Sequence, residues 1–100
     1  MDKIEIKGIV YSIDDKQQIS QKFAKREIII ETLEQYPQHL KIHFINDKCD
    51  ILNMYKIGDS VAICINLRGR LFVDKSNQRQ CFNALEGWKI ELNGINQQTQ

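Results

Sequence analysis

The feature that most constrains this chain is the position of its one segment with helical periodicity. Over residues 47–55, apolar side chains recur at every third position, Asn46 or Asp47 suits the N-cap, and Gly58 suits the end of the helix. The sequence therefore predicts one short helix at 47–55. Because so short a helix is marginal in water by itself, we expect the strands around it to hold it by packing.

Other segments have the alternating or β-branched composition that is typical of strands. Five strands are predicted, over residues 4–13, 26–34, 39–46, 59–74 and 81–92. Gly8 inside the first strand indicates a bulge or a bend, and the last strand is expected to bend near Glu86 and Gly87. The eleven residues 14–24 between the first two strands are polar and are predicted to form a loop.

Alternation within a strand assigns its side chains to two faces. In residues 39–46 the side chains expected to face the core are Leu40, Ile42 and Phe44. Those expected to face outward are His39, Lys41 and His43. In residues 59–74 the inward positions are predicted to be Val61, Ile63, Ile65 and Leu67. The opposite face of that strand is then shared by Arg68, Arg70 and Phe72.

Five strands with a short helix between the third and the fourth is the element order of an OB-fold, a small and partly open Greek-key barrel. We expect this all-β barrel to cover residues 1–92 as one domain, followed by a disordered polar tail at 93–100. An immunoglobulin-like sandwich would need about seven strands. An SH3-like barrel is the rival architecture, but its helix and loop order match less well.

The net charge of +1 hides an uneven distribution of the basic residues. Eight of the fourteen lysines and arginines lie in residues 16–26 and 68–80. In an OB-fold these segments are the loop between strands 1 and 2 and the hairpin between strands 4 and 5, which flank one groove. The sequence therefore predicts an electropositive channel. Chance clustering of charge on solvated loops is the alternative interpretation.

The predicted nucleic-acid-binding residues combine cations for phosphates with rings that stack on bases. They are Lys22, Lys25, Arg26, Tyr36, His39, Lys41, His43, Arg68, Arg70, Phe72, Lys75 and Arg79. Phe72 is expected to stack on a base, with a place at the end of the core as the alternative. Phe82 suits either role equally. Glu27 and Glu31 would project beside the cations and weaken binding to phosphate.

Other classes of function find no support in the sequence. We expect neither an enzyme nor a cofactor, because we find no nucleophile elbow, glycine-rich phosphate loop or paired-carboxylate motif. Cys49, Cys64 and Cys81 do not have the pairing of a disulfide framework or a zinc site, and the His-x-Lys-x-His row has no third metal ligand in sequence reach. The apolar run 61–65 is too short for a membrane span, and the start of the chain has no signal-peptide pattern, so we expect a cytoplasmic protein.

The segment GDSVAICINLRGRLFVDKSNQRQCFNALEGWKIEL resembles the fourth-to-fifth strand region of bacterial single-stranded DNA-binding proteins. The shared pattern is a glycine-led strand, an Arg-x-Arg-x-aromatic-x-Asp tip, an aromatic restart and an acidic residue beyond it. In this chain the pattern falls on Gly58, Arg68, Arg70, Phe72, Asp74, Phe82 and Glu86. Through KREIIIET, EQYPQHLKIHF, DKCDILN and FNALEGWKIE, residues 4–92 are also similar to a small family of OB-fold domains of bacteria and phages.

This resemblance implies that Phe72 stacks on a base, that Arg68 and Arg70 contact the strand, and that the chain forms a homo-oligomer, either a dimer or a tetramer. Two features depart from those proteins. The last eight residues have no acidic, hydrophobic tip, and the one tryptophan, Trp88, lies on the last strand and not on the binding face. We expect a protein that binds single-stranded DNA without strong sequence preference, in replication, recombination or repair. RNA binding and a protein-interaction OB module are the alternatives.

Overall fold

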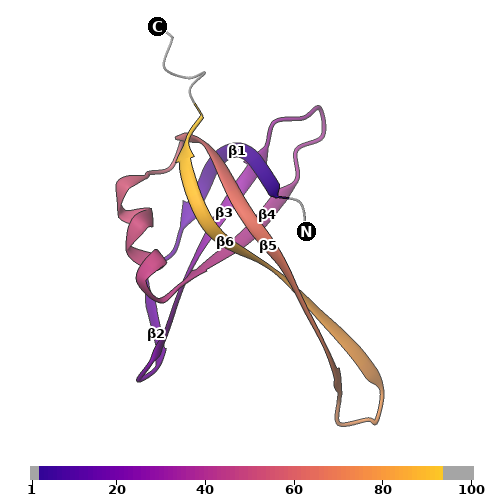
Figure 1. The fold of residues 1–100 in the computed structure, drawn as a ribbon. Coiled ribbons are helices and arrows are strands. Elements are labelled where there is room, and N and C mark those ends of the chain that lie inside the picture. The colour runs from indigo at the N-terminus through magenta and orange to yellow at the C-terminus, as the bar shows by residue number, and fades with distance from the viewer. Residues whose placement is uncertain (1–2, 94–100) are drawn as a thin grey trace, which may run out of the picture.

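The computed structural model of the chain describes residues 3–93, which form six strands and one 3-10 helix (Figure 1). The elements are β1 (Ile4–Ile13), β2 (Gln17–Ser20), β3 (Phe23–Thr32), β4 (His39–Ile45), η1 (Asn46–Met54), β5 (Ser60–Val73) and β6 (Arg79–Leu92). No helix in this part of the chain is long and apolar enough to cross a membrane. The predicted tail at 93–100 lies outside the described residues except for Asn93.

The strands form one curved sheet in the order β1-β5-β6-β4-β3-β2, and a further pairing between β1 and β3 closes it into a barrel. Closure between β4 and β6 is short, because their parallel pairing covers only Ile42 with Leu85 and His43 with Glu86. The five predicted strands correspond to β1, β3, β4, β5 and β6, and η1 lies between the third and the fourth of them. The predicted OB-fold is confirmed.

The barrel interior is filled by apolar side chains that alternate along the strands. Its buried members are Val10, Ile28, Ile30, Ile42, Phe44, Leu52, Val61, Ile63, Ile65 and Ile90. The inward faces expected for β4 and for the first half of β5 are therefore present, with Leu40 only half-buried. Phe44 packs so closely on β6 that a Cβ atom added to Gly87 would lie 2.4 Å from the ring Cζ. Glycine at 87 is required by this close approach.

Two irregularities bend the barrel strands. In β1 the register with β3 shifts between Val10 and Ser12, two residues beyond the bulge position that Gly8 indicated. Gly8 itself is a site of close approach, because a Cβ there would lie 2.5 Å from Cγ2 of Ile30. In β6 the register with β5 shifts beside Trp88, one residue from the bend expected at Glu86 and Gly87.

The predicted loop over 14–24 is wrong beyond residue 16, apart from the turn at 21–22. Residues 17–20 form the short strand β2, and β3 begins at Phe23, three residues earlier than expected. The two strands pair as a hairpin, with Gln18 opposite Ala24. Every side chain of β2 is exposed, so no apolar side of the strand was there to produce an alternating pattern. Backbone pairing alone makes this segment a strand.

The helix is where the sequence places it, but its geometry and its cap differ from the prediction. It is a 3-10 helix that begins at Asn46, and the cap residue Ile45 makes no side-chain capping bond. Asn46 has a positive φ of 50°. Its Oδ1 accepts a hydrogen bond from the backbone N–H of Ala24 at 2.9 Å. The asparagine therefore ties the start of the helix to β3 instead of capping it.

Beyond the barrel, β5 and β6 continue as a two-stranded ribbon, which we call the arm (residues 67–85). It is the long orange hairpin in Figure 1. Pairing runs unbroken from Leu67 opposite Leu85 to Val73 opposite Arg79. Leu67 was expected to face the core, but it is 55% exposed. Leu67 is exposed because β5 has left the barrel by residue 67, where β6 is its only pairing partner among the described residues.

Candidate nucleic-acid interface

A groove of about 860 Å³ lies between the arm and the outer face of β3 and β4. Its lining residues come from both sides and are Phe23, Lys25, Glu27, Lys41, His43, Arg70, Phe82, Asn83, Ala84 and Leu85. In Figure 1 the β2–β3 hairpin and the arm project from the same end of the barrel. The groove thus joins the two basic segments that the sequence places far apart.

The wall formed by β3 and β4 follows from their register. Glu27 pairs with His43, and Ile29 pairs with Lys41. Because side chains alternate along strands, Lys25, Glu27, Lys41 and His43 all leave the face opposite the core. The outward positions expected for His39, Lys41 and His43 are confirmed, with His43 half-buried and the other two exposed.

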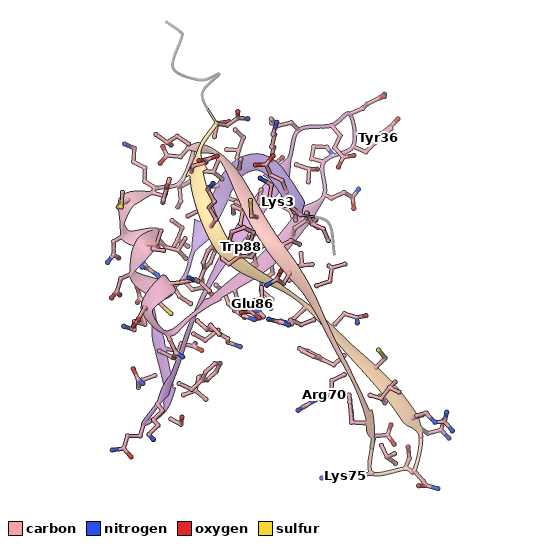
Figure 2. The ribbon with its side chains drawn as sticks, viewed as in Figure 1. Lys3, Tyr36, Arg70, Lys75, Glu86 and Trp88 are labelled. Carbon is pink, nitrogen blue, oxygen red and sulfur yellow. The ribbon has the colours of Figure 1, made fainter. Side chains whose placement is uncertain are left out.

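The wall formed by the arm carries an arginine and an aromatic ring side by side. Arg70 and Phe82 are direct cross-strand partners, so both side chains leave the same face of the ribbon. Phe82 is 58% exposed and lines the groove. Phe72 is on the same face two residues nearer the tip and is 44% exposed, but it is outside the groove lining. Figure 2 shows Arg70 between Glu86 at the base of the arm and Lys75 at its tip.

Two ion pairs partly neutralise the basic side chains around the groove. Nζ of Lys25 lies 3.6 Å from Oε2 of Glu27. Nε of Arg68 donates to Oε1 of Glu86 at 2.6 Å, where the carboxylate side chain is only 17% exposed. Arg68 is therefore paired at the base of the arm, where it joins β5 to β6.

Other groove cations are available to a ligand. Within the part of the chain that the structure describes, no carboxylate oxygen lies within 4.0 Å of Lys41 or Arg70. Among the lining residues that the structure describes, the three cations Lys25, Lys41 and Arg70 face a single carboxylate, that of Glu27. The groove is therefore positively charged even with His43 neutral. Glu27 does project beside the cations, as the sequence indicated.

His43 sits at the floor of the groove. Burial lowers its pKa below 6.5, the nearby Glu86 carboxylate opposes that effect, and Lys25 adds to it. The imidazole is therefore mostly neutral at pH 7, where it contributes chiefly a ring and a hydrogen-bonding group.

Arg26 and Lys22 lie outside the groove lining. Arg26 points to the opposite face of β3, where its guanidinium donates to the backbone oxygen of Asp14 at 2.8 Å and to Oδ1 of Asn53 at 2.7 Å. A third bond, to the backbone oxygen of Cys49, measures 3.2 Å. Arg26 thus joins β1, β3 and η1. Lys22 is exposed in the turn between β2 and β3.

Tyr36, Lys75 and Arg79 lie farther away, at the two ends of the molecule. Tyr36 is 74% exposed in the loop between β3 and β4, and Lys75 is in the turn at the tip of the arm. Figure 2 shows these two residues far apart. Arg79 lies opposite Val73 at the end of the ribbon. Of the predicted binding residues, the structure gathers Lys25, Lys41, His43 and Arg70 into the groove lining.

Three aromatic residues near the groove were not among the predicted binding residues. Phe23 lies in what the sequence indicated as a loop, so its alternation with Lys25 was not visible. For Phe82 the sequence allows either stacking on a base or a place in the core. Tyr11 lies within the register shift of β1, between Val10 and Ser12, and is 55% exposed. Its ring is 4.8 Å from that of His39 in an edge-on arrangement, which extends the aromatic and basic surface along β4 beyond the groove.

Comparisons with known proteins agree with this architecture. A family model described as "Domain of unknown function (DUF3127)" matches residues 5–91. A crystal structure of the mitochondrial single-stranded DNA binding protein Rim1 from S. cerevisiae superimposes with a TM-score of 0.71. The two chains are 17% identical, and the match covers 91% of this chain and 93% of the other. No curated protein matches by sequence. At this identity the superposition shows the shared fold.

Proposed function

The chain belongs to the family described as "Domain of unknown function (DUF3127)", and we propose that it binds single-stranded DNA without strong sequence preference. The observation that carries the proposal is the groove itself. It brings Lys25 and Lys41 of the barrel within one cavity of Arg70 and Phe82 of the arm. Cations beside exposed rings are the combination that holds a single strand.

The two kinds of side chain have different parts in binding. Lys25, Lys41 and Arg70 attract the phosphates, and this contribution is independent of sequence. Phe82 and Phe23 offer rings to unpaired bases, and stacking of this kind contributes about 1–3 kcal/mol per base. A base in a duplex already stacks on its neighbours and is not free to enter the groove. The arrangement therefore favours single strands over duplexes.

The path of the strand follows from the same surface. It runs from the arm over the outer face of β4 toward His39 and Tyr11, which present a further pair of rings. Glu31 lies directly beside His39, as its register partner on β3. A carboxylate at that position repels phosphate and weakens binding at this end of the path.

Sequence-tolerant binding of single-stranded DNA serves replication, recombination or repair, and we place the protein in that class of process. The support is the groove chemistry together with a fold shared with a protein whose name states that it binds single-stranded DNA. The alternative ligand is RNA. The distinction between RNA and DNA depends on contacts to the 2′-hydroxyl, and a comparison of oligo-U with oligo-dT tests it.

The test is fluorescence anisotropy of labelled oligo-dT titrated with the full chain, with oligo-U and a duplex of equal length alongside. We expect saturable binding to oligo-dT that exceeds duplex binding. With three groove cations in contact with phosphates, the slope of log affinity against log salt should be about −2. Arg70→Ala and Lys41→Ala should each make this slope less steep by about 0.7.

The matched control is Lys89→Ala, which removes an exposed lysine of β6 that does not line the groove. It should leave both affinity and slope unchanged. Equal affinity for duplex and single strand, or equal loss in Lys89→Ala and Lys41→Ala, would assign the binding to general surface charge and overturn the proposal. Tighter binding to oligo-U than to oligo-dT would move the ligand to RNA.

A further inference from the structure

The tip of the arm presents a surface that the groove does not use. On the ribbon face opposite Arg70 and Phe82, Leu71 and Val73 are 67% and 63% exposed. Val73 lies directly across from Arg79, and Lys75 follows in the turn. An apolar strip is therefore bordered by two cations. A two-stranded ribbon with an uncovered apolar side is marginally stable in water, so covering this strip is favourable.

The tip is held in a defined shape. Oδ1 of Asp74 accepts hydrogen bonds from the backbone N–H groups of Ser76 and Gln78, each at 2.9 Å, and its Oδ2 accepts one from Gln80 at 2.9 Å. These bonds lower the pKa of Asp74 to about 2. The carboxylate is thus turned back into the turn, and the charges that the tip offers outward are those of Lys75 and Arg79.

The other end of the molecule has the complementary surface. A hollow of about 620 Å³ lies beside the loop between β3 and β4. Its described lining includes Glu31 and Glu34 together with the apolar Ile9, Leu33 and Pro37, and it contains no basic side chain. Leu33 is 62% exposed.

This loop is also preformed. The hydroxyl of Thr32 donates to Oε2 of Glu34 at 2.6 Å and accepts from the backbone N–H of Gln38 at 2.8 Å. Backbone pairing between Thr32 and Gln38 closes the loop at 2.9 Å. An acidic and apolar hollow is therefore presented with little conformational entropy left to lose on binding.

The two surfaces cannot meet within one chain. Figure 2 shows Tyr36 of the β3–β4 loop at one end of the molecule and Lys75 of the arm tip at the other. The long axis of the molecule measures 56 Å. Any contact between tip and hollow is therefore a contact between two copies.

We propose that the arm tip of one chain docks into the β3–β4 hollow of a second copy, with Leu71 and Val73 against Leu33 and Ile9. Arg79 and Lys75 then face Glu31 and Glu34. Two preformed surfaces of the same chain are complementary here, both in charge and in apolar contact. Because the two surfaces differ, the contact is heterologous, and repetition of it generates a ring or an open chain of copies.

The test is sedimentation velocity of the full chain without DNA over a series of concentrations. Two double variants reverse the charge on one surface each, namely Lys75→Glu with Arg79→Glu, and Glu31→Lys with Glu34→Lys. We expect self-association of the unchanged protein, and in each double variant a rise of about tenfold or more in the concentration needed for it. Circular dichroism and thermal melting establish that both variants are folded.

The decisive measurement is the equimolar mixture of the two double variants. In the mixture, the acidic tip of the first variant can dock into the basic hollow of the second. The unchanged basic tip of the second variant can dock into the unchanged acidic hollow of the first. The mixture should therefore recover the association of the unchanged protein. Leu71→Ser should weaken association through loss of apolar contact, and Lys89→Glu, remote from both surfaces, should not. A monomeric protein at every concentration, or double variants that associate normally, or a mixture that fails to recover, would each overturn the proposal.

Discussion

Strand β5 passes through two environments, and the contrast between the barrel and the arm explains most of what this molecule presents to a ligand. In residues 60–65 every residue is buried, and β5 is paired with β1 along one edge and with β6 along the other. In residues 67–73 every side chain is exposed, because the strand is paired with β6 alone. The same strand is therefore core in one half and binding surface in the other.

The lesson is that pairing and burial are separate contributions to a β-structure. The arm has continuous backbone pairing and little apolar burial. The barrel has both. Global stability should therefore reside in the barrel, while changes in the arm should alter binding with little effect on unfolding. Substitutions in each region and changes of pH test that division.

Two phenylalanines, one in each region, give the sharpest contrast. Phe44→Ala empties a fully buried position in the barrel and should lower the free energy of unfolding by about 3–5 kcal/mol. Phe82→Ala, on the arm, should change it by less than about 0.5 kcal/mol and should weaken oligo-dT binding by about 1–3 kcal/mol. Urea denaturation and anisotropy measure the two quantities. A large loss of stability in Phe82→Ala would show that the arm belongs to the core.

Two glycines, Gly87 in the barrel and Gly69 in the arm, test how each region tolerates an added Cβ atom. A Cβ on Gly87 would lie 2.4 Å from the ring of Phe44, so Gly87→Ala should cost about 1–3 kcal/mol of stability through overpacking. A Cβ on Gly69 of the arm would meet the end of the Asn83 side chain at 2.9 Å, and that amide is free to move away. Gly69→Ala should therefore change the urea midpoint only slightly. Equal midpoints for the two variants would contradict the division.

His43 lies where the two regions meet, and it makes both stability and binding depend on pH. Its pKa in the folded state is below the unfolded value of 6.5, so folding disfavours the protonated ring. The associated stability is fully present above pH 6.5 and is lost as the pH falls through 6.5 toward the lower folded value. Protonation also adds a positive charge to the groove, so affinity for oligo-dT should rise over the same range.

The matched variant is His43→Gln, which keeps a polar side chain and removes the titration. It should flatten the dependence of both quantities between neutral pH and values just below 6.5. Urea midpoints and anisotropy over this range provide the measurement. An unchanged pH dependence in His43→Gln would assign the effect to another group.

Asp74 provides the smallest expected effect on global stability. Its pKa of about 2, against an ordinary value of 3.8, results mainly from the hydrogen bond with the backbone of Gln78 and then from bonds with Ser76 and Gln80. The stabilisation of the turn is thus fully present above pH 3.8 and is lost as the pH falls through about 2. Asp74→Ala should speed hydrogen exchange at the tip and leave the barrel amides unchanged. Faster exchange throughout the barrel would show that the arm and the barrel unfold together.

Much of the barrel could be predicted from the sequence, because apolar and polar residues alternate along a strand that is buried on one face only. The row Leu40, Ile42, Phe44 and the single helical segment before Gly58 placed β4 and η1 correctly. The strand β2 is exposed on both faces, so its sequence shows no such alternation. Leu67 continued an inward pattern after the barrel had ended, since periodicity reports the face of a strand and not whether anything packs on that face.

The candidate site was predicted in part for a similar reason. The outward positions of Lys41 and His43 follow from alternation within one strand. Arg26, in contrast, is a cation of the kind that binds phosphate. Because side chains alternate along β3, it lies on the opposite face from Lys25 and bonds to η1. Phe82 had no assignment until the arm was seen to carry it beside Arg70.

By itself, the sequence determined the order of five of the six strands along the chain, the place of the helix, the faces of the barrel strands and the presence of two basic segments. These properties depend on neighbours in the chain, through side-chain alternation and local turn chemistry. The tertiary structure alone decided which cations share one groove, where β5 leaves the barrel, and which aromatic rings remain uncovered. Those properties depend on the pairing of β4 with β6 and on the projection of the arm, which join residues more than forty positions apart, such as Lys25 and Arg70.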